Sequence, residues 1–100
     1  MRRVQGGPLR LLKSLRGDGA LSWGRRAQRP VSYCIDLYGQ GQLLSGDGDV
    51  AGELSDLVDR NPADVRLRLA SGQELRVQLR EIRADGASIE LLGPISAAVD

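Results

Sequence analysis

The sequence predicts an all-β fold: a small antiparallel β-barrel with a basic, flexible N-terminal arm. Apolar and polar residues alternate over much of residues 31–92, and glycine-containing turns separate these runs. The chain has 100 residues, enough for one domain with a modest core. Only 3% of the residues are aromatic and Phe is absent, so the core must be built from Leu, Val, Ile and Ala.

The charge is divided unevenly along the chain. Residues 1–30 carry eight Arg or Lys and one Asp, whereas residues 31–100 carry six Arg and twelve acidic residues. We therefore expect residues 1–24 to form a flexible basic arm and residues 25–100 to form an acidic barrel domain. Within the arm, Leu9–Arg16 has the spacing of two helical turns, too short to be stable alone. The Arg-rich, acid-poor start is also similar to a mitochondrial transit peptide.

The first predicted strand is Val31–Tyr38, in which Tyr33, Ile35 and Leu37 share one face. The glycines that follow it predict a turn around Leu43 and Leu44. A second strand is expected over Val50–Val58, and an Asn-Pro loop follows it.

The clearest alternation lies in the second half of the chain. Val65, Leu67 and Leu69 alternate with arginines, and a Gly-containing turn leads into the next run. Ile82 falls out of phase with Leu79, which predicts a β-bulge near Glu81. Asp-Gly then predicts a tight turn before a strand over Ser88–Leu92. About five strands result, closing into a barrel with the predicted core Ile35, Leu37, Leu54, Val65, Leu67, Leu69, Leu75, Val77, Leu79, Ile89 and Leu91.

The composition disfavours several functions. The chain has one cysteine, Cys34, and no histidine, so zinc sites and Cys-His or Ser-His nucleophiles are excluded. We expect no enzyme activity, no metal and no cofactor. A single cysteine suits a reducing compartment, which predicts a cytoplasmic protein. No apolar run approaches the roughly 18 residues of a membrane span.

An arginine cluster precedes the first predicted strand. Arg25, Arg26 and Arg29 lie just before Pro30, with Trp23 just upstream. Arginine can hold a phosphate through two parallel N–H bonds or stack on a base, and Trp offers a further flat surface. The cluster is therefore a candidate nucleotide clamp. The alternative is that these arginines pair with the acidic barrel or complete a basic tail.

The segment from Arg25 onward resembles the opening of a PilZ domain. That family begins with an R-x-x-x-R motif ahead of a six-stranded antiparallel barrel, and Arg25 and Arg29 match this motif. The family's second motif is [D/N]-x-S-x-x-G. Asp56 stands at its acidic position, Val58 at the Ser position and Asn61 at the Gly position; an alternative alignment uses Asp47, Asp49 and Gly52.

The resemblance implies a regulatory module that binds cyclic di-GMP through Arg25, Arg26, Arg29 and Asp56, with the arginines on phosphates and guanines. The alternative is a small Sm- or SH3-like barrel that binds a protein partner and no nucleotide. A third interpretation is a nucleic-acid-binding barrel. The acidic body and the small number of aromatic residues disfavour it.

Overall fold

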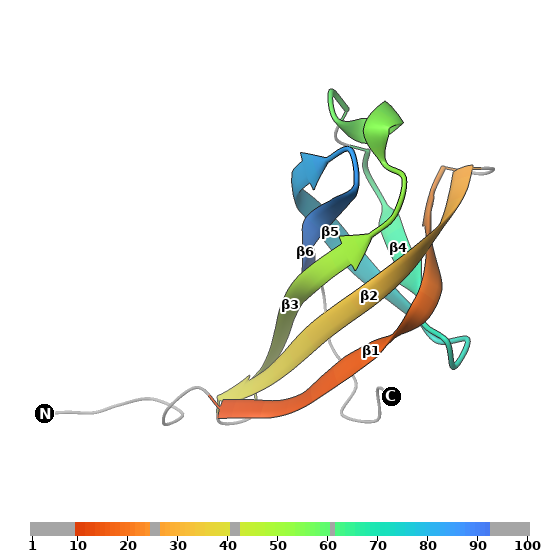
Figure 1. Cartoon of the computed structure of the whole chain (residues 1–100). Helices are drawn as coiled ribbons and strands as arrows, with labels where there is room; N and C mark the ends of the chain where they lie inside the picture. The colour runs from red at the N-terminus through yellow and green to blue at the C-terminus, as the bar shows by residue number, and fades with distance from the viewer. Residues whose placement is uncertain (1–9, 25–26, 41–42, 61, 93–100) are drawn as a thin grey trace, which may run out of the picture.

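The computed structural model describes residues 10–24, 27–40, 43–60 and 62–92, which form a closed antiparallel β-barrel (Figure 1). Among these residues, no helix has the length and hydropathy needed to cross a membrane. Around the barrel the strands follow the order β1-β2-β3-β6-β5-β4, so the predicted fold class is confirmed. The elements are β1 (Arg10–Trp23), β2 (Ala27–Gln40), β3 (Leu43–Ala51), the 3₁₀ turn η1 (Ser55–Leu57), β4 (Val65–Arg68), β5 (Glu74–Arg83) and β6 (Gly86–Leu91).

The barrel interior is filled by aliphatic side chains and Tyr33. Every residue of the predicted core is buried, and the arginines of β4 are exposed, as the alternation predicts. The predicted β-bulge is also confirmed, because the pairing of β5 with β6 shifts between Leu79 and Ile82. The core further contains residues that the prediction did not list: Leu15, Leu21, Val31, Tyr33, Val50, Leu57 and Ala87.

The flexible arm predicted for residues 1–24 is wrong for Arg10–Trp23, which form β1 and supply the sixth strand of the barrel. The helix expected over Leu9–Arg16 is wrong from Arg10 onward, and residues 1–9 lie outside the described residues. The glycines of this segment serve close packing instead of chain mobility. A Cβ on Gly17 would lie 2.7 Å from Tyr33 Oη, and one on Gly19 would collide with the Arg68 carbonyl oxygen.

The predictions for residues 43–58 also need correction. The glycine-rich stretch predicted as a turn lies within β3, where a Cβ on Gly48 would collide with the backbone of β2 at Cys34. The strand expected over Val50–Val58 ends at Ala51. After it, Leu54 directly precedes η1 and Leu57 ends it, and both are buried in the core. Residues three positions apart would face opposite sides of a strand, so burying both side chains requires a turn here.

Candidate functional site

Arg29, the third arginine of the predicted clamp, lies near the start of β2 and reaches to Asp56 in η1. Its Nη1 and Nη2 donate to the two carboxylate oxygens of Asp56, each over 3.0 Å. Nη1 also donates to the backbone carbonyl of Glu53. A guanidinium fork that meets both oxygens of a carboxylate gives geometric specificity as well as attraction. These contacts fix Arg29 in one orientation.

The barrel itself positions Asp56. Leu54 and Leu57 flank it in sequence and are 0% and 1% exposed, so both sides of the turn are anchored in the core. The Leu54 N–H donates to the Ala84 carbonyl in the β5–β6 turn over 2.8 Å. η1 lies at the same end of the barrel as the end of β1 and the start of β2 (Figure 1). Asp56 is therefore presented to Arg29 by a packed turn.

Trp23 adds an aromatic surface to the same cluster. Arg29 is opposite Leu21 in the β1–β2 ladder, and Trp23 follows two residues later on the same face of β1. The Arg29 Cζ lies 5.8 Å from the centroid of the Trp23 ring, within the range of a cation–π contact. Trp23 in turn packs against the hydrophobic core. We name Trp23, Arg29 and Asp56 the rim cluster.

The electrostatics of the rim cluster follow from these contacts. The hydrogen bonds from Arg29, together with its positive charge, lower the pKa of Asp56. The same hydrogen bonds and the nearby carboxylates raise the pKa of Arg29. The side chains of Arg29 and Asp56 are 27% and 51% exposed, so water screens the pair. Both groups carry their charges at neutral pH, and an incoming ligand can reach them from solvent.

The structure brings two of the four predicted ligand-binding residues together. Arg29 and Asp56 are 27 positions apart in sequence and meet in space. Arg25 and Arg26 lie outside the described residues. Asp47, the acidic residue of the alternative alignment, lies in β3 opposite Asp36 and Glu90, away from the rim cluster.

Sequence reasoning missed two parts of the site. The Glu53 carbonyl oxygen cannot be recognised from residue type, because every residue carries one. The anchoring role of Leu57 does have a signal, since Leu54 and Leu57 are three positions apart, the repeat of a 3₁₀ turn. The strand predicted over Val50–Val58 does not use this spacing, because residues three apart face opposite sides of a strand.

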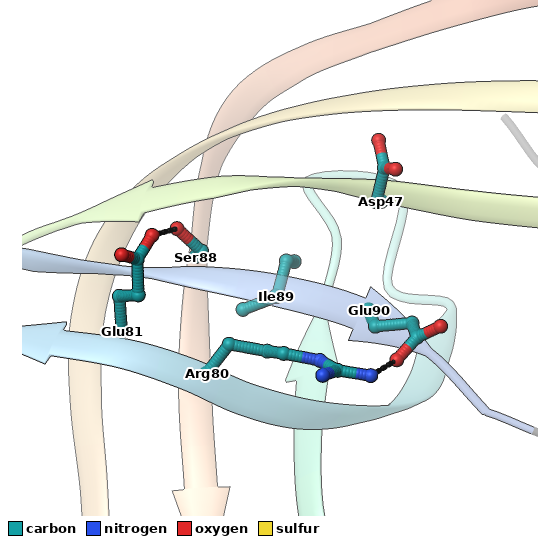
Figure 2. Close-up of a pocket in the computed structure, with 6 residues that line it drawn as sticks. All are labelled: Asp47, Arg80, Glu81, Ser88, Ile89 and Glu90. Atoms are coloured by element: carbon teal, nitrogen blue, oxygen red, sulfur yellow. Dashed lines mark hydrogen bonds and ion pairs between the residues drawn. The ribbon is translucent and has the colours of Figure 1, made fainter.

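A pocket on the outer surface of β3, β5 and β6 is a weaker candidate for an anion (Figure 2). Within it Arg80 is already paired with Glu90, and the Ser88 hydroxyl donates to Glu81 over 3.5 Å. Three carboxylates against one guanidinium would repel a dianionic ligand. The pocket is lined by Asp47, Arg80, Glu81, Ser88, Ile89 and Glu90.

A second pocket adjoins the rim cluster in sequence, since it includes both neighbours of Trp23. It adds the exposed side chain of Arg66, which the β4–β1 pairing sets opposite Ser22. Arg66 therefore borders a hollow in addition to lying on the outer face of the sheet. The lining residues are Ser22, Gly24, Ala63, Asp64 and Arg66.

Comparison of the chain with protein-family models, with curated proteins and with solved structures gives no match. The inference about function therefore depends on the chemistry of the rim cluster.

Proposed function

We propose that this chain is a regulatory binding module of the PilZ type, not an enzyme, and that it binds cyclic di-GMP at the rim cluster. One observation carries the proposal: Arg29 and Asp56, taken from two separate motifs, are in direct contact. The six-stranded antiparallel barrel is also the architecture that the resemblance implies. A motif match made by chance would give no reason for these two side chains to meet.

The rim cluster has the groups that a cyclic dinucleotide needs. The guanidinium of Arg29 can bind a phosphate in place of the Asp56 carboxylate, because phosphate and carboxylate each present two oxygens to the paired N–H donors of the guanidinium. The released carboxylate can then accept hydrogen bonds from the N–H groups on the Watson–Crick edge of a guanine. Trp23 provides a flat face on which a base can stack. In the free protein, Asp56 holds Arg29 ready for this exchange.

Glu53 adds two contacts in the same turn. Its backbone carbonyl accepts a hydrogen bond from Arg29, and its side chain accepts one from the Ser55 N–H over 3.2 Å. These contacts help to hold the turn that carries Asp56.

Calorimetric titration with cyclic di-GMP at fixed salt tests the proposal. We expect wild-type protein to give saturable heat, and Arg29→Ala to weaken binding by about 10- to 100-fold, the loss of a hydrogen bond to a charged group. Arg29→Lys should also weaken binding, because an ammonium reproduces neither the fork nor the stacking surface. Arg68→Ala is the matched control, since Arg68 is exposed and pairs with Glu74 in a neighbouring strand.

Two outcomes contradict the proposal. If wild-type protein gives no heat at millimolar ligand, the rim cluster does not bind the nucleotide, and the alternative of a protein-interaction module is favoured. If Arg68→Ala weakens binding as much as Arg29→Ala, the attraction is general electrostatics, which salt would screen.

A further inference from the structure

Among the residues that the structure describes, one edge of β1 has no partner strand over most of its length. β1 pairs with β2 from Arg10 to Trp23, but it pairs with β4 only at Ala20, Leu21 and Ser22. Over Arg10–Asp18, no strand among the described residues lies against the second edge, and Figure 1 shows this part of β1 at the margin of the sheet. The open edge is about 30 Å long, at about 3.3 Å for each of its residues.

An open edge presents backbone N–H and C=O groups that can pair with another strand. Proteins commonly protect such edges with charges and bulges, and β1 has both. Its pairing with β2 shifts between Leu11 and Lys13, and Arg10 and Arg16 are exposed. These features discourage pairing with an arbitrary apolar strand. They leave the edge suited to a strand of opposite charge.

The side chains along this edge are cationic and apolar. Arg10 and Arg16 are exposed, and the one acidic residue of this edge, Asp18, accepts a hydrogen bond from the Ser32 hydroxyl over 3.0 Å. Leu11 and Leu12 are 58% and 56% exposed, more than any other large apolar side chain described. The edge thus offers positive charge together with uncovered apolar surface.

We propose that the open edge of β1 binds an extended acidic peptide of a partner protein as an added antiparallel or parallel strand. Backbone pairing would supply affinity and the side chains would select the partner. A carboxylate of the peptide would meet Arg16, which lies opposite Cys34, and an apolar residue on the other face of the peptide would cover Leu12, which lies against Gly39. If two copies of the chain paired through β1, the cations of one copy would face those of the other. An acidic strand is therefore a better partner for this edge than a second copy of β1. This proposal is independent of cyclic di-GMP binding.

The test uses a short fluorescent peptide of alternating glutamate and valine, with three comparisons. A peptide of alternating lysine and valine tests charge. The same glutamate peptide methylated on alternate backbone nitrogens tests backbone pairing. The variant Arg16→Glu tests the edge, and Arg76→Glu is its control, because Arg76 is also exposed but lies in β5, which is paired on both sides. The readouts are fluorescence polarisation and amide hydrogen exchange of the protein.

We expect the glutamate peptide to bind and to slow amide exchange in β1. Arg16→Glu should weaken binding by about three- to tenfold, as expected when an opposite-charge cross-strand pair becomes a like-charge pair, and Arg76→Glu should change it little. The lysine peptide and the methylated peptide should not bind.

Four results would overturn the proposal. Equal binding of the charged peptides would remove the selection by charge, and undiminished binding of the methylated peptide would remove strand pairing. Slow exchange of the outward amides of β1 in dilute, monomeric protein would mean that the chain covers its own edge. Binding to anionic phospholipid vesicles through Leu11 and Leu12, without binding of the glutamate peptide, would identify the edge as a membrane contact.

Discussion

Replacing Leu57 by alanine tests whether η1 is an integral part of the barrel, as the geometry of the candidate site requires. Leu57 is 1% exposed, so the variant loses the burial of three carbons, about 2.4 kcal/mol at about 0.8 kcal/mol each. A residual cavity adds to this loss. The cavity should be partly filled, because the neighbouring residues of η1 face solvent and can settle inward. We expect a total loss of about 3 kcal/mol from the free energy of unfolding.

Urea denaturation measures this loss, and thermal unfolding should show a decrease of about 12 to 24 °C in Tm for a domain of this size. Val58→Ala is the matched control, because Val58 is the next residue in the chain and is 45% exposed. Its effect should stay within about 0.5 kcal/mol. The pKa of Asp56, followed by NMR, should return toward its ordinary value in Leu57→Ala, because the turn no longer holds the carboxylate against Arg29.

A loss below about 1 kcal/mol in Leu57→Ala, or one no larger than that of Val58→Ala, would refute this reasoning. It would mean that η1 lies loosely over the barrel end. Asp56 would then have no fixed position from which to orient Arg29.

Three further predictions concern the pair at the rim and the packing of β1. Pairing with Arg29 lowers the pKa of Asp56, so the contribution of the pair to stability is present above the ordinary pKa and is lost as pH falls through the lowered pKa. The difference in free energy of unfolding between wild type and Asp56→Asn should therefore be constant above about pH 5 and shrink below it. A difference that grows in acid would contradict the assignment. Tyr33→Phe should lower the free energy of unfolding, measured by urea denaturation, by about 1 kcal/mol, because the Ala70 N–H that donates to the Tyr33 hydroxyl over 3.0 Å loses its acceptor. An unchanged urea midpoint would mean that water replaces the hydroxyl. Gly19→Ala should lower the free energy of unfolding by about 1–3 kcal/mol, because its Cβ would collide with the Arg68 carbonyl oxygen and separate β1 from β4. A variant as stable as wild type would show that this contact is not tight.

The sequence was sufficient to predict the second half of the barrel. Apolar and polar residues alternate within Val65–Leu69, Leu75–Leu79 and Ala87–Leu91, so the period of two identifies both the strands and their buried faces. Even the bulge near Glu81 is visible as a break in that period. Here local pattern and tertiary packing agree.

The first half was harder to predict because its glycines have two possible meanings. Gly19 and Gly48 lie inside strands where a neighbouring backbone leaves no room for a Cβ, but in a sequence glycine first suggests a turn. β1 also buries only Leu15 and Leu21 and extends beyond its short pairing with β4, so its apolar pattern is sparse. A strand defined by its neighbours cannot be recognised from its own residues.

The candidate site was predictable in its residue types and not in its arrangement. Arg29 and Asp56 could be selected as binding residues from motif positions. Their contact depends on the turn that Leu54 and Leu57 anchor in the core. That turn is set by long-range packing and by the Leu54 bond to the β5–β6 turn, neither of which a local sequence window contains.

The most direct test of the central claim is an NMR titration of the isotope-labelled protein with cyclic di-GMP. If the rim cluster is the binding site, the amides of Arg29 and Asp56 and the indole N–H of Trp23 should shift together and saturate at one ligand concentration. The amides of β5 and β6 that border the outer pocket, such as those of Arg80 and Glu90, should not move. Shifts that are absent at millimolar ligand, or that centre on the outer pocket instead of the rim cluster, would contradict the claim.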